Sequence, residues 1–360
     1  SNTFPTGLND AGQVIGYSSA AADSRLAHAF LWQDGRITDL GTLGGDESSA
    51  EDVNDSGQVV GWATLMPGFA ASRHAVLWSN GQIIDLGTLG GSNSEARAIN
   101  NSGQIVGWAE TAEADALRAS GGFPREGCLP RHAFLWENGV MTDLGTLGGP
   151  CSEAWSISDT GVVTGYAEAA GQGQDLFGNP FRHAVLWRAG ELMDLGRADG
   201  FEHAEALAVN ARGEVLVTAH AGGDVRQRAF VWRDGALMDL GSVPGFRYTF
   251  AAGINNLGWI AGSTSTDDSI ENAGFLYRGG RMVRLDSLLP SDSGWAELSF
   301  VVGINNAGQV AGTGMLNGAV RAFLMTPSAA DRDTDGVVDA LDNCPSVANP
   351  DQAVSDADGT

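Results

Sequence analysis

At residues 74–78 the chain carries the run His-Ala-Val-Leu-Trp, and close copies of this run return through residues 1–326. The seven copies end at Trp32, Trp78, Trp136, Trp187, Trp232, Tyr277 and Met325. The intervals between these end residues are 46, 58, 51, 45, 45 and 48. Because a period of about 40 to 50 residues is typical of propeller blades, we interpret this part of the chain as seven repeats.

A second unit lies between these runs. Its clearest copy, residues 98–108, has two short apolar stretches around an Asn-x-x-Gly turn, where asparagine and glycine tolerate the positive φ angles of hairpin loops. The first run is likewise followed by a two-residue turn, such as Asn80-Gly81, and by a stretch that ends in Asp-Leu-Gly. Each repeat is therefore expected to hold four strands, named a to d in chain order, that form two hairpins.

Seven four-stranded antiparallel units predict an all-β protein, folded as a seven-bladed β-propeller over residues 1–326. An open β-solenoid is the alternative architecture. The seventh repeat ends at residues 325–327 without an Asp-Leu-Gly strand, so the last blade is expected to lack its outer strand. We expect the missing strand to lie upstream in a longer precursor, and the incomplete blade to offer an edge for strand pairing.

The repeated run also resembles the bacterial HAF family of extracellular repeats, named for the His-Ala-Phe form seen at residues 28–30 and 132–134. The resemblance covers residues 1–326. It implies a secreted or cell-surface bacterial protein and carries little information about activity.

Composition narrows the classes of function. The 43 % of hydrophobic residues is enough for a packed core, and the 51 glycines favour many tight turns over long helices. The formal net charge of -24, from 44 acidic and 20 basic residues, argues against nucleic acid as a partner, because such binding depends on cationic side chains. No apolar stretch reaches the roughly 18 residues of a membrane span.

Length variation between the repeats falls on one face of the expected propeller. The a–b and c–d turns are uniformly tight, whereas the large insertions all join strand b to strand c. They cover residues 18–27, 64–73, 110–131, 168–182, 220–227, 263–272 and 314–320. Because loops on a rigid scaffold often carry function, this b–c loop face is the expected docking surface for a protein or glycan partner. Neutral insertion at a permissive place is the alternative.

The longest b–c loop contains Cys128, and the crossover into strand a of the fourth repeat contains Cys151. The propeller topology brings both residues to the b–c loop face, so we expect a disulfide between them, with two free thiols as the alternative. A disulfide would indicate an oxidising compartment. No partner is assigned to the third cysteine, Cys344.

Three sets of repeated side chains are interpreted as structural. The histidines that open the runs sit at equivalent positions of different blades, so we expect structural hydrogen bonds rather than a shared metal ion. These are His28, His74, His132 and His183. The Asp-Leu-Gly aspartates are expected to bind turn amides, and the repeated tryptophans are expected to pack between blades.

An enzyme would need acids that break the repeat and converge in one pocket. The acids in the variable loops are Glu110, Glu113, Asp115, Asp175, Asp267, Asp268 and Glu271. Paired carboxylates can hydrolyse glycosidic bonds, but the sequence does not fix their separation. It holds no Gly-x-Ser-x-Gly, His-Glu-x-x-His or phosphate-loop motif. We therefore expect a protein without catalytic residues, with a polysaccharide hydrolase or lyase as the alternative.

After a linker at residues 327–330, residues 331–360 form an aspartate-rich tail that cannot build its own hydrophobic core. Residues 331–342 have the ligand spacing of an EF-hand-like calcium loop, with Gly336 at the sixth position for the sharp turn. The expected ligands are Asp331, Asp333, Asp335, the carbonyl of Val337, Asp339 through water, and Asp342. Calcium is therefore the expected cofactor.

The tail also resembles a thrombospondin type 3 repeat, through residues 339–345 and 349–352. In that family aspartate loops wrap calcium ions, cysteines pair between neighbouring repeats, and the tract forms a calcium-dependent stalk outside the cell. The resemblance implies a second, incomplete calcium loop that contains Asp356 and Asp358.

Overall fold

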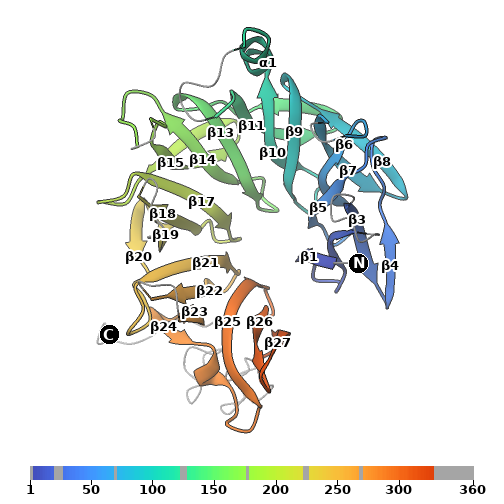
Figure 1. The fold of residues 1–360 in the computed structure, drawn as a ribbon. Helices are drawn as coiled ribbons and strands as arrows, with labels where there is room; N and C mark the ends of the chain where they lie inside the picture. The colour runs from blue at the N-terminus through green and yellow to red at the C-terminus, as the bar shows by residue number, and fades with distance from the viewer. Residues whose placement is uncertain are drawn as a thin grey trace. The chain divides into compact units, whose positions relative to one another are not determined.

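The computed structural model describes residues 3–19, 27–68, 71–121, 128–175, 178–221, 227–266 and 271–327. In this part the chain is almost all strand, with one helix, α1 (Ala112–Ala119), and one short 3-10 helix, η1 (Asp286–Leu288) (Figure 1). The all-β prediction is confirmed. The chain divides into two compact units, Ser1–Met238 and Asp239–Thr360. The predicted calcium ligands and Cys344 lie outside the described residues.

In the first unit, three sheets have four antiparallel strands that follow chain order. They are β1–β4 (Thr3–Leu8, Val14–Ser19, Ala27–Gln33, Arg36–Asp39), β5–β8 (Ser48–Val53, Val59–Thr64, Arg73–Ser79, Gln82–Gly87) and β17–β20 (His203–Val209, Val215–His220, Gln227–Arg233, Ala236–Asp239). Each sheet is the pair of hairpins that the repeat predicts. Sheets of this kind are the blades of a β-propeller.

The third and fourth repeats are joined into one eight-stranded sheet. Its strands are β9–β12 (Gly90–Ile99, Ile105–Thr111, Arg131–Glu137, Val140–Asp143) and β13–β16 (Gly148–Ile157, Val163–Ala169, Arg182–Arg188, Glu191–Gly196). The two halves meet where β11 pairs in parallel with β13, at Arg131 and Cys151. Because Cys151 is bonded to Cys128, just before Arg131, the disulfide holds the start of β11 against β13. The prediction of seven separate blades is therefore corrected: the described residues form five separate blades and this larger sheet.

The second unit contains two blades. The first is the four-stranded sheet β21–β24 (Tyr248–Ile254, Ile260–Ser265, Asn272–Arg278, Arg281–Arg284). The second is the sheet β25–β27 (Trp295–Ile304, Val310–Leu316, Ala319–Met325), which has three strands among the described residues. These are the three strands that the sequence predicts for the seventh repeat, and the missing fourth strand stays a prediction.

Local turn chemistry explains the hairpins. Both residues of the c–d turn in the second repeat have positive φ angles, 53° at Asn80 and 73° at Gly81. Such turns match the right-handed twist of the flanking strands, and asparagine followed by glycine adopts them with little strain.

The asparagine of the a–b turn also links neighbouring repeats in four places, which the sequence did not predict. Asn54 is buried, and its side-chain oxygen accepts a hydrogen bond from the amide of Gln58. Its side-chain nitrogen donates to the carbonyl of Asn100, the equivalent residue of the next repeat, at 3.1 Å. The same link joins Asn9 to Asn54 and Asn100 to Ser158 in the first unit, and Asn255 to Asn305 in the second.

Within each unit the core lies between successive repeats. Trp187 is only 1 % exposed, packs among residues of the third repeat, and donates its indole N–H to the carbonyl of Leu144 at 2.8 Å. Gly107 of strand b lies so close to strand a that an added Cβ would meet the carbonyl oxygen of Glu95 at 1.9 Å. Packing of a tryptophan between blades is confirmed for Trp78, and Trp187 packs in the same way between the two halves of the eight-stranded sheet, whereas Trp32 is 37 % exposed.

Candidate functional site

The four repeated histidines bind aspartates of their own repeats. In the second repeat, Nδ1 of His74 lies 2.9 Å from Oδ1 of Asp85, which also accepts a hydrogen bond from the amide of Gly87. Equivalent contacts at 2.8–3.0 Å are His28 with Asp39, His132 with Asp143 and His183 with Asp194. The structural interpretation of these histidines and aspartates is confirmed.

Two of the candidate catalytic acids meet in the longest b–c loop. Arg118 of α1 forms ion pairs with both Glu110 and Asp115. The hydroxyl of Ser92, followed by Arg118, lowers the pKa of Asp115, because both groups stabilise the charged carboxylate. A glycosidase needs one carboxylic acid with a raised pKa, which keeps its proton until it donates it to the leaving group. The lowered pKa of Asp115 is opposite to this requirement.

The remaining acids lie in other places. Glu113 is on α1, Glu271 directly precedes β23 in the second unit, and Asp267 and Asp268 lie outside the described residues. Asp175 follows β14 and approaches a histidine instead of a second acid. Glu110 and Asp115 therefore meet at Arg118, whereas Asp175 lies at this histidine.

That histidine, His203, belongs to a pair that sequence reasoning missed. The rings of His203 and His220 stack with their centroids 5.0 Å apart. The amide of Arg182 donates to Nδ1 of His203 at 3.2 Å, so Nε2 carries the proton and faces Oδ2 of Asp175 at 3.4 Å. Burial, with His220 and Arg182 nearby, lowers the pKa of His203. Both histidines depart from the repeat, which is the signal that could have revealed them.

Arginines at the start of strand c connect neighbouring repeats at the same end of the sheets. Arg131 packs over the ring of Trp108, 5.0 Å from its centroid, and forms an ion pair with Glu153 of the following repeat. The hydroxyl of Tyr166 donates to the same carboxylate at 2.9 Å. Equivalent arginine–glutamate pairs are Arg73 with Glu95 and Arg182 with Glu205. Burial lowers the pKa of Arg131, but Glu153, Tyr166 and Glu95 together raise it above its usual value, so the arginine stays charged.

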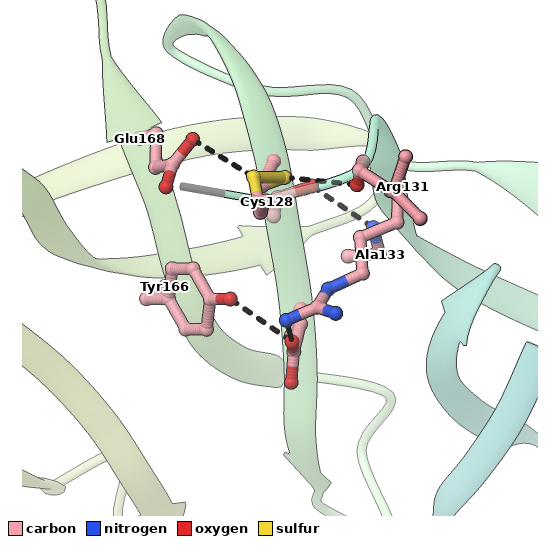
Figure 2. The surroundings of a disulfide bond; sticks show 9 residues. Cys128, Arg131, Ala133, Tyr166 and Glu168 are labelled. Atoms are coloured by element: carbon pink, nitrogen blue, oxygen red, sulfur yellow. Dashed lines mark hydrogen bonds and ion pairs between the residues drawn. A yellow bond between two sulfur atoms is a disulfide. The ribbon is translucent and has the colours of Figure 1, made fainter. Parts of the chain in front are cut away.

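The structure joins Cys128 and Cys151 by a disulfide at this face, with their Cα atoms 6.7 Å apart (Figure 2). Cys128 is 8 % exposed and Cys151 is fully buried. Two oxygen atoms contact the sulfurs: Oε2 of Glu168 lies 3.4 Å from Sγ of Cys128, and the carbonyl oxygen of Leu129 lies 3.3 Å from Sγ of Cys151. The disulfide thus anchors the longest b–c loop to strand a of the next repeat.

A partly open pocket adjoins the same strands, at the start of β13 and the end of β14. It is lined by Gly148, Gly149, Ala169, Ala170, Gly171, Gly173, Gln174 and Pro180. None of these eight residues is ionisable, so the pocket offers backbone groups and one side-chain amide for hydrogen bonds. Such a lining suits a neutral polar ligand better than acid–base chemistry.

Comparison with protein families matches the thrombospondin type 3 repeat to residues 329–352, which include the predicted calcium ligands from Asp331 to Asp342. No curated protein matches the chain. The resemblance of residues 1–326 to the HAF family stays a prediction. None of the helices in the described part has the length and apolar composition for crossing a membrane.

Solved structures share the fold. The acylaminoacyl peptidase of Pyrococcus horikoshii has a TM-score of 0.52 and 12 % identity, over 90 % of this chain and 51 % of its own. The β-propeller domain of the Trilobed protease from Pyrococcus furiosus, described as an open velcro topology, has a TM-score of 0.52 and 9 % identity, over 89 % of this chain and 92 % of its own. The chain spans about half the length of the acylaminoacyl peptidase. At such identities the likeness shows a β-propeller fold alone.

Proposed function

We propose that the chain is a non-catalytic bacterial protein, secreted or held on the cell surface, whose propeller presents its b–c loop face to a protein or glycan. The observation that carries this proposal is the disulfide between Cys128 and Cys151, which fixes the longest b–c loop beside the open, uncharged pocket. A loop fixed in advance loses less conformational entropy on binding. Disulfides persist mainly in oxidising compartments, which agrees with a place outside the cytoplasm.

The tail belongs to the same proposal. Its match to the thrombospondin type 3 repeat supports a calcium-dependent stalk, with ligands from Asp331 to Asp342 and a second loop at Asp356 and Asp358. The exposed edge of the last blade, where Val320 is 64 % exposed, is proposed as a place for strand pairing. The net charge of -24 excludes nucleic acid from the proposed partners.

The alternative is a polysaccharide hydrolase or lyase that uses loop carboxylates. Glu110 and Asp115 both form ion pairs with Arg118, and this favours the alternative because it brings two acids close together. The lowered pKa of Asp115 opposes it, because the chemistry needs a proton donor in this pair.

The test is a binding screen of the whole chain, in the presence of calcium, against arrayed glycans and surface proteins. For each ligand found, Gln174→Arg fills the pocket at the b–c loop face, whereas Val140→Arg places the same charge on an exposed c–d position. We expect the first variant to weaken binding at least about tenfold, or about 1.4 kcal/mol, and the second to leave it unchanged. Equal effects of the two variants, or release of a shortened polysaccharide, would contradict the proposal.

A further inference from the structure

The disulfide is surrounded by groups that complement a different state of the two cysteines. A disulfide sulfur carries no hydrogen, yet each sulfur contacts an oxygen that accepts hydrogen bonds. These oxygens are the carboxylate Oε2 of Glu168 and the carbonyl oxygen of Leu129. If the cysteines were reduced, each thiol could donate a hydrogen bond to its neighbouring oxygen. Alternatively, the two sulfurs and the carboxylate could ligate a cation. The surroundings therefore suit reduced cysteines or a bound cation as well as the disulfide.

The carboxylate is placed for such a role by strand β14. Glu168 is 1 % exposed, lies near the end of that strand, and points toward the sulfurs (Figure 2). The equivalent acid of the preceding repeat, Glu110, binds Arg118. Arg131 lies close in sequence to Cys128, but its guanidinium forms an ion pair with Glu153. Glu168 nonetheless has a cation nearby, because its charge is among those that raise the pKa of Arg182.

We propose that, when reduced, Cys128 and Cys151 form with Glu168 a site for a soft divalent cation of the zinc type. In this site the two sulfurs and one carboxylate oxygen all lie within 4.8 Å of one another, and all three residues are buried. Zinc takes thiolate sulfur at about 2.3 Å and carboxylate oxygen at about 2.0–2.2 Å in a tetrahedral arrangement. A fourth position remains for water or for the carbonyl of Leu129, which already lies beside Cys151.

The cysteine Cα atoms, 6.7 Å apart, are close enough for the disulfide and leave room for a metal ion between separated sulfurs. Reduction requires a dithiol, which supplies two electrons and two protons and becomes a disulfide itself. The S–S bond breaks and two S–H groups form. Metal binding then releases both thiol protons to solvent, and two thiolates ligate the ion. Disulfide and metal are therefore mutually exclusive states of one site.

The experiment uses the whole chain carrying Cys344→Ser, so that only the two site cysteines remain. The protein is reduced, freed of reductant without oxygen, and titrated with Co²⁺ alone. We expect one equivalent of Co²⁺ to bind with thiolate-to-cobalt charge-transfer absorption, and Zn²⁺ to displace it. The aspartate-rich tail offers oxygen ligands, which give no such absorption. The oxidised protein is expected to show none, and a reduced protein without this absorption would overturn the proposal.

The carboxylate is tested by Glu168→Gln against Glu110→Gln, which alters the equivalent acid of the preceding repeat. We expect the first variant to weaken Co²⁺ binding at least about tenfold and the second to leave it unchanged. Equal affinity of both variants would remove Glu168 from the site. If Glu168→Gln does not fold, the chain with Glu168 intact still gives a decision. Zn²⁺ should slow alkylation of Cys128 and Cys151 at least tenfold, and an unchanged rate would overturn the proposal.

Discussion

The two ends of strand b differ in every repeat of the first unit. At one end the a–b turns are nearly identical, and Asn54 and Asn100 each donate a hydrogen bond to the next turn. At the other end the b–c loops differ from one repeat to the next: one carries α1 and Cys128, and the next carries Asp175. The repeated end uses its side chains to join repeats, and the variable end carries buried ionisable groups that depart from the repeat, such as His203. In this protein, residues that keep the repeat indicate stability, and residues that break it indicate a site.

The largest effect is expected at the repeated end, from Asn100→Ala. This change removes hydrogen bonds to the carbonyl of Ser158 and from the amide of Gln104. Because partly buried backbone groups lose their partners, the free energy of unfolding should fall by about 2–3 kcal/mol. Urea denaturation measures it. Ser158→Asn supplies the asparagine that this repeat lacks and should not destabilise the protein. Unchanged stability of Asn100→Ala would break the comparison.

A smaller effect with a defined pH dependence is expected at Asp52, close to the same end. Burial raises its pKa to about 6, although the amides of Ile99 and Val53 act in the opposite direction. The folded protein therefore binds this proton more tightly than the unfolded chain, and the stabilisation is lost as the pH rises through about 6. Between pH 5 and pH 7 the loss is about 1 kcal/mol.

The measurement is the free energy of unfolding at both pH values for Asp52→Asn, which removes the titrating group. The difference between pH 5 and pH 7 should change by that amount. Asp55→Asn alters an exposed acid of the adjacent turn and gives the residue found at Asn101 of the next repeat. The same pH dependence in both variants would show that Asp52 is not its source.

Whether a feature of this structure can be predicted from the sequence depends on how far apart along the chain its interacting residues lie. The hairpins were predictable because turn residues such as Asn80 and Gly81 act locally. The joining of the third and fourth repeats was not, because the parallel pairing of Arg131 with Cys151 joins the backbones of two different repeats, which the local turn residues do not determine. The place of the disulfide was predicted from topology. Its carboxylate neighbour, Glu168, was missed because acids at strand ends are common and only packing brings this one to the sulfur.

At the variable end the pH dependence should have the opposite sign. Burial, His220 and Arg182 lower the pKa of His203, so as the pH falls below about 6.5 the unfolded chain takes up the proton more readily than the folded protein. Stability is then lost toward low pH. His203→Gln should lessen this loss, measured by unfolding at pH 7 and pH 5. His28→Gln, which alters a repeated and more exposed histidine, is the matched control. Equal effects would remove the distinction between the two kinds of histidine.

The smallest effect on the propeller is expected from calcium. Asp331, Asp333, Asp335, Asp339 and Asp342 repel one another unless a divalent ion lies among them, so ion binding and ordering of this tail segment should be coupled. Extracellular calcium modules bind at about 10⁻⁴ to 10⁻³ M. Replacing Asp333 and Asp335 by alanine should abolish calcium uptake in calorimetric titration of the whole chain. The melting transition of the blades should stay unchanged, because their stability comes from interblade packing such as that of Trp187. A shift of that transition by calcium would instead show that the tail binds the blades, and the aspartates would then belong to the functional surface and not to a separate stalk.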